Sequence, residues 1–187
     1  MRQRPRLRIG AGAALLLAAL YFFDDSGVFS AMLPAVLAHE LGHVLALRLG
    51  GARLTRLRLG AEGLSLDYSG AMGRGAECLC TLMGPLSGAL FAAAASLLGR
   101  RMGSEFLLCA AGVSAALTAF NLLPAPVLDG GRALSAFLPE KVSIALGLVT
   151  GCALLLAGLY CAFAGLGLAL LPAGLWVTVG TARWRAR

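Results

Sequence analysis

The residues best suited to chemistry form the run His39-Glu40-Leu41-Gly42-His43. Positions i and i+4 of a helix lie on one face, so His39 and His43 could bind one metal ion, with Glu40 beside it to take a proton from water. These are the only two histidines of the chain. Because ionisable groups inside a membrane helix each cost about 2.5–3.5 kcal/mol, their place in an apolar stretch indicates a metal site.

A third ligand must come from elsewhere, because catalytic zinc usually takes three protein ligands and keeps a position for water. The acidic candidates are Glu62, Glu77 and Asp129, and the lack of a third histidine excludes the metzincin pattern. Asp129 stands out because two prolines and two glycines surround it in the run Asn121–Gly131 and break the helix there. Irregular backbone at membrane depth is tolerated where it lines a wet cavity. The alternative for Asp129 is an N-cap of the next helix without a metal.

Asn121 is the only asparagine of the chain and closes an apolar segment. Its amide could donate a hydrogen bond to a developing oxyanion. The alternative is a structural hydrogen bond across helices.

The composition predicts the elements that must position these residues. Hydrophobic residues make up 59% of the 187 residues and charged residues 13%, against roughly 45–50% and about 25% in soluble domains. The mean hydropathy is +0.83. A core of this size cannot hide so much apolar surface, so the excess must face lipid. The composition therefore predicts a multi-pass membrane protein of one domain, 1–187, with no separate soluble domain.

The fold class expected is an all-α polytopic membrane protein with about six transmembrane helices, since a spanning helix needs about 20 apolar residues. The last two spans require a reversal near Ala164–Gly167, and one span with an interfacial helix is the alternative. The arginines before the first span also resemble a signal peptide. The expected spans are 9–23, 28–49, 76–98, 106–123, 142–160 and 164–181.

The net charge of +7 gathers at the ends of these apolar runs. At these positions the positive charges indicate the membrane topology and could contact anionic lipid. Nucleic acid is therefore not an expected partner. The positive-inside rule predicts a protein of the cell membrane with both termini in the cytoplasm.

The segment 52–68 departs from the helical pattern. Leucines alternate with polar residues around Gly60 and Gly63, a period of two that predicts a membrane-associated β-hairpin. An amphipathic surface loop is the alternative.

Two motifs together carry a family resemblance. H-E-L-G-H in an apolar helix, followed by N-x-x-P-x-x-x-L-D-G-G, resembles the site-2 proteases, which are intramembrane zinc metalloproteases. The arrangement is most similar to the stage IV sporulation protein FB branch, and Met83-Gly84-Pro85 is similar to the G-P element between the motifs of that family. The chain ends at Arg187, so the CBS domain that this branch commonly carries is not expected.

The resemblance implies one zinc ion per chain and a role for each motif residue. It implies His39, His43 and Asp129 as zinc ligands, Glu40 as catalytic acid and base, and Asn121 near the substrate.

The resemblance also implies a substrate class. It implies hydrolysis of a peptide bond in or near the transmembrane segment of a membrane-tethered precursor, such as a sigma factor or anti-sigma factor, and a role in sporulation. The hairpin would pair with an unwound substrate strand, and other membrane proteins would regulate the cleavage. The partners expected are thus the substrate, the bilayer and these regulators.

Three other functions fit parts of the pattern. A gluzincin-type membrane protease would use Glu62 as its third ligand. A transporter would use the same ionisable residues as a proton or ion relay. An inactive adaptor would need none of the catalytic residues that this chain carries.

Overall fold

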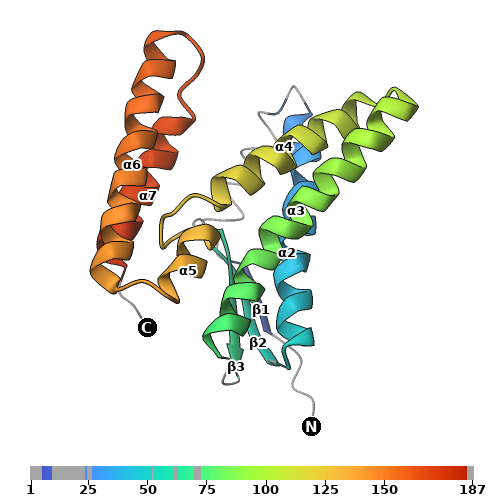
Figure 1. The fold of residues 1–187 in the computed structure, drawn as a ribbon. Coiled ribbons are helices and arrows are strands. Elements are labelled where there is room, and N and C mark those ends of the chain that lie inside the picture. The colour runs from blue at the N-terminus through green and yellow to red at the C-terminus, as the bar shows by residue number, and fades with distance from the viewer. Residues whose placement is uncertain are drawn as a thin grey trace.

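The computed structural model describes residues 6–9, 24, 27–51, 53–60, 63–69 and 73–184 (Figure 1). This part of the chain contains six helices and three strands. The helices are α2 (Val28–Leu49), α3 (Arg74–Met102), α4 (Glu105–Asn121), α5 (Asp129–Ser135), α6 (Glu140–Phe163) and α7 (Leu170–Arg183). The strands are β1 (Arg6–Ile9), β2 (Arg53–Gly60) and β3 (Gly63–Ser69).

Three of the described helices, α2, α3 and α6, are long and apolar enough to cross a membrane. α4 is apolar but has 17 residues, and α7 has 14, against the roughly 20 that a span needs. The prediction of six spans is therefore not supported by the helix lengths. The span expected at 9–23 lies outside the described residues, apart from Ile9, which is part of β1.

The chain reverses between α6 and α7, close to the expected position. α6 ends at Phe163, and Gly165 and Gly167 take φ values of 70° and 119°. Such positive φ values are open to glycine at little cost. The irregular turn continues to Ala169, which shortens the last helix relative to the expected 164–181. α6 and α7 then pack against each other as a pair beside the other helices (Figure 1).

Helix α2 has two faces of opposite character. Leu37, Leu41 and Leu45, spaced four residues apart, are 61%, 63% and 55% exposed. Ala35 and His39 are buried on the inner side. A helix at a water-facing surface exposes its polar side chains and buries its apolar ones. α2 instead exposes a row of leucines and buries a histidine, as expected of a helix with a lipid-facing surface.

Helices α2, α3 and α4 pack on one another through small residues. A Cβ at Gly42 of α2 would overlap the Ser87 side chain and the Met83 carbonyl of α3. The Ser87 hydroxyl donates a hydrogen bond to the Ala38 carbonyl of α2 at 2.7 Å. Close approach of two backbones, with a serine hydrogen bond between the helices, is typical of helix packing in membranes. These contacts fix the position of α2 along α3.

The strands form a three-stranded sheet in the order β1-β2-β3. β2 and β3 pair antiparallel from Arg53↔Ser69 to Gly60↔Gly63 at the turn, close to the segment 52–68 expected for a hairpin. β1 pairs parallel to β2, from Arg6↔Arg56 to Ile9↔Leu59. An all-α class with only a hairpin is thus corrected to helices with a small mixed sheet. A four-residue strand has too short a pattern to be recognised alone, and its backbone groups find their partners in distant β2.

The proline-containing loop between α4 and α5 is partly buried in the protein, with Ala125, Pro126 and Leu128 buried. Ala125, Leu128 and Val177 of α7 form a fully packed cluster, which Phe120, Leu123, Val127 and Leu154 extend. This loop therefore joins the α2–α4 group to the α6–α7 pair, and it holds the start of α5 in place (Figure 1).

Candidate metal centre

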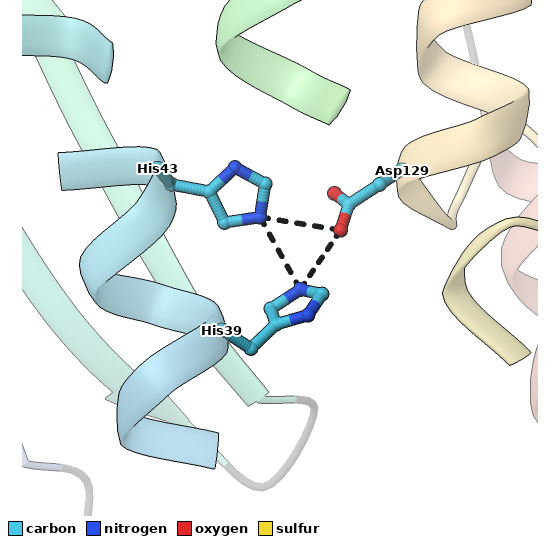
Figure 2. A group of neighbouring side chains, drawn as sticks. All are labelled: His39, His43 and Asp129. Atoms are coloured by element: carbon cyan, nitrogen blue, oxygen red, sulfur yellow. Dashed lines mark hydrogen bonds and ion pairs between the residues drawn. The ribbon is translucent and has the colours of Figure 1, made fainter. Parts of the chain in front are cut away.

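Three side chains from distant parts of the chain converge on one point (Figure 2). The Nε2 atoms of His39 and His43 lie 3.0 and 3.2 Å from Oδ2 of Asp129. The two Nε2 atoms are 3.3 Å apart. His39 and Asp129 are 4% and 7% exposed. Among the described residues, these three form the group with the spacing of a metal site.

The helical repeat places the two imidazoles together. His39 and His43 are one turn apart on α2, with ring centroids 5.0 Å apart and ring planes at 74°. This near-perpendicular arrangement lets both Nε2 atoms point to the same side of the helix (Figure 2).

A backbone carbonyl of α3 orients the ring of His43. Nδ1 of His43 lies 2.9 Å from the Cys80 carbonyl oxygen. A carbonyl can only accept, so Nδ1 carries the proton and donates it, and in the neutral ring Nε2 keeps a lone pair. This support of a ligand by a carbonyl on its other nitrogen is typical of metal-binding histidines.

Asp129 is the first residue of α5, and the residue at the N-cap position is Leu128. The interpretation of Asp129 as an N-cap is therefore wrong, and its carboxylate faces the histidines instead (Figure 2). Side chains at Gly130 and Gly131 would overlap the backbone of Leu122 and Ala125. The two glycines thus let α5 begin against the loop and aim Asp129 at α2.

The electrostatics favour an ionised Asp129. Burial raises the pKa of the Asp129 carboxyl, but its contacts with His39 and His43 outweigh burial and lower that pKa to about 2. α5 lies outside the three helices that could span a membrane. A carboxylate must be deprotonated to bind a metal, and this one is ionised at neutral pH.

The donor atoms fit zinc. Ligand atoms about 2.0–2.1 Å from a tetrahedral zinc lie about 3.3–3.4 Å from one another, close to the 3.0, 3.2 and 3.3 Å observed. When the His43 ring is neutral and its proton is on Nδ1, Nε2 of His43 and Oδ2 of Asp129 present lone pairs to each other, a contact that a cation between them stabilises. Two imidazoles and one carboxylate are a ligand set that zinc accepts in catalytic sites.

The other predicted site residues lie as follows. Glu40 is partly exposed on α2, within electrostatic reach of His43, His39, Asp129 and Arg132. Glu40 therefore lies beside the cluster, and the three ligand atoms come from other residues.

The structure does not join Asn121 to the three-residue cluster by a hydrogen bond. Its Nδ2 donates to the Leu117 carbonyl of its own helix at 3.0 Å, rather than across helices. An amide carries two N–H groups, so this bond leaves the second donor at the end of α4. Glu77 is exposed in the first turn of α3 and outside the cluster, and Glu62 lies outside the described residues.

Sequence reasoning did not find the groups that support the ligands. The Cys80 carbonyl has no signal in the sequence, because any residue type supplies the same backbone oxygen. In the sequence Gly84 is recognisable only as part of the G-P element similar to that of the family, and the structure shows why a glycine is needed there. A Cβ at Gly84 would overlap the imidazole of His43.

Two comparisons with known proteins match parts or all of this chain. The family model described as Peptidase family M50 matches residues 71–158. The match covers α3 to α5 and most of α6, with Asn121 and Asp129, whereas the histidines of α2 precede it. No curated protein matches the chain.

Among solved structures, the chain is similar to the "Site-2 Protease from Methanocaldococcus jannaschii". The TM-score is 0.71 and the sequence identity 21%, and the alignment covers 100% of this chain and 96% of that one. At this identity the likeness establishes a shared fold.

Replacing Gly84 with alanine should remove the metal site. The new methyl group would occupy the place of the His43 ring, so the ring must turn away and lose its alignment with His39 and Asp129. We expect zinc affinity to fall by at least the roughly 10–100-fold that loss of an orienting contact costs. Zinc content of the purified protein measures the effect.

Gly112→Ala is the matched control, because a Cβ at Gly112 of α4 meets no atom within 4 Å. Its zinc content should equal that of the wild type. A Gly84→Ala protein with full zinc content would show that His43 does not need this space.

Proposed function

We propose that this protein is an intramembrane zinc metalloprotease of the site-2 protease family. The observation that carries the proposal is the convergence of His39, His43 and Asp129 within 3.3 Å beside Glu40. The family model over 71–158 and the fold shared with a site-2 protease support it. So do the three helices that are apolar and long enough to cross a membrane.

Each residue of the centre has a separate task in this proposal. His39, His43 and Asp129 would hold one zinc ion, which supplies a Lewis acid that activates water and polarises a carbonyl. Glu40 is not needed as a ligand, so its carboxylate takes the proton of the attacking water and later gives a proton to the leaving amine. Asn121 directs its remaining N–H to the substrate backbone.

The substrate must be locally unwound, because each carbonyl inside an intact helix is already hydrogen-bonded. The sheet offers a place for such a strand. β2 is central in the order β1-β2-β3, so an added strand would pair along β3 or β1, as in β-strand addition.

The substrates are membrane-tethered precursors with a single span, such as a sigma factor or its anti-factor. The resemblance of the two motifs to the sporulation branch supports this class. The distribution of arginines supports cytoplasmic termini, and regulatory membrane proteins would control access to the site.

Cleavage by the reconstituted protein tests the proposal. The full chain is placed in lipid vesicles with single-span test substrates that carry tethered transcription factors. We expect cleavage near the substrate span, loss of cleavage with a zinc chelator, and recovery when zinc is restored. Cleavage that persists without zinc would contradict the metalloprotease, and proton or ion flux without cleavage would instead favour a transporter.

A further inference from the structure

The two histidines of the metal centre differ at their second ring nitrogen. Nδ1 of His43 is bonded to the Cys80 carbonyl. Nδ1 of His39 is buried and has no hydrogen-bond partner among the described residues. A buried polar atom is nearly always satisfied in a folded protein, so His39 requires a partner that completes its support.

Thr118 of α4 carries a second buried polar atom without a partner in the described part of the chain. Its hydroxyl is unlike those of Thr81, Thr150 and Thr178, which each donate to the carbonyl four residues earlier in their own helix. The hydroxyl of Thr118 is therefore not taken up by its own helix.

Both atoms face the same glycine of α3. A Cβ at Gly88 would lie 2.6 Å from Oγ1 of Thr118 and 3.6 Å from Nδ1 of His39. Because residue 88 is a glycine, no side chain at this position lies between the Thr118 hydroxyl and the His39 ring. Ser114, one turn before Thr118, donates to the Gly88 carbonyl at 2.9 Å and holds α4 against α3 at this level.

We propose that Thr118 is the positioning residue for His39. One bridging water in the space beside Gly88 accepts a hydrogen bond from Nδ1–H of His39 and donates one to the Thr118 hydroxyl oxygen. The proton is thereby kept on Nδ1, and Nε2 keeps the lone pair that it turns toward the metal.

This proposal rests on the zinc site of the proposed function, and zinc binding tests it without any substrate. The full chain is purified in detergent, and its zinc affinity is measured by competition with a chromophoric chelator. The visible spectrum of the cobalt-substituted protein reports the geometry of the ligands. We compare Thr118→Val, which keeps the shape and removes the hydroxyl, with Thr118→Ser, which keeps the hydroxyl.

Thr118→Val should weaken zinc binding by about 10–100-fold, the usual effect of losing such an outer contact, and should alter the cobalt spectrum. Thr118→Ser should restore both. Thr181→Val is the matched control, because Thr181 of α7 also has a buried hydroxyl without a partner among the described residues but belongs to another helix pair. It should bind zinc as the wild type does.

Two results would overturn the proposal. One is wild-type affinity and spectrum in Thr118→Val. The other is equal damage in Thr118→Ser and Thr118→Val, which would assign the effect to packing of the methyl group.

Gly88→Ala is a second test, which is used if Thr118→Val does not fold. Its Cβ would push the hydroxyl away from the ring, so we expect the same loss of zinc affinity while the hydroxyl is present. Wild-type affinity in Gly88→Ala would overturn the proposal. A wild-type chain that binds zinc without cleaving any substrate would refute the protease and leave the role of Thr118 standing.

Discussion

Glu40→Gln should abolish peptide cleavage while zinc stays bound. Glutamine has nearly the shape of glutamate but cannot take a proton from water. The three ligand atoms, from His39, His43 and Asp129, are unchanged by this substitution. Loss of a general base typically costs about 10²–10⁴-fold in rate, so cleavage of a tethered substrate should fall to background. Product formation and zinc content are measured on the same preparation.

Glu77→Gln is the matched control, because Glu77 is an exposed glutamate in the first turn of α3 and not one of the three clustered residues. Its cleavage rate should equal that of the wild type. Retained cleavage in Glu40→Gln would refute its assigned role as base. Loss of zinc from this variant would make Glu40 a ligand instead.

Asp129→Ala should lose zinc itself, and all cleavage with it. The substitution removes the oxygen that lies 3.0 and 3.2 Å from the two imidazoles, and it leaves two ligands where a catalytic zinc usually has three. We expect a larger loss of affinity than the roughly 10–100-fold caused by removing an outer contact. Metal analysis after gentle purification measures the loss.

The comparison with Glu62→Ala decides between the two possible third ligands. If Asp129 is the ligand, Glu62→Ala should keep its full zinc content. Zinc kept by Asp129→Ala and lost by Glu62→Ala would support the gluzincin arrangement. Arg132→Gln controls for changes in the charge of α5, since Arg132 is exposed on that helix, and it should also keep zinc.

The fold was predictable where one segment's own composition decides its structure. α2 has the bounds 28–49 expected for it, because a long apolar run must satisfy its own backbone groups as a helix. β1 was missed, because its four residues gain hydrogen bonds only from β2 far along the chain. α7 is shorter than expected because hydropathy alone does not show where the glycine-rich reversal ends.

The site divides in the same way. A spacing of four residues places His39 and His43 on one helix face, whatever the surrounding fold, and the sequence alone determined that pair. Tertiary packing decided the rest: it brings Asp129 to the pair across 90 residues, supplies the Cys80 carbonyl, and opens the spaces at Gly84 and Gly88. These contacts depend on how helices pack at a distance, and no local pattern encodes such distances because many side chains share in setting each one.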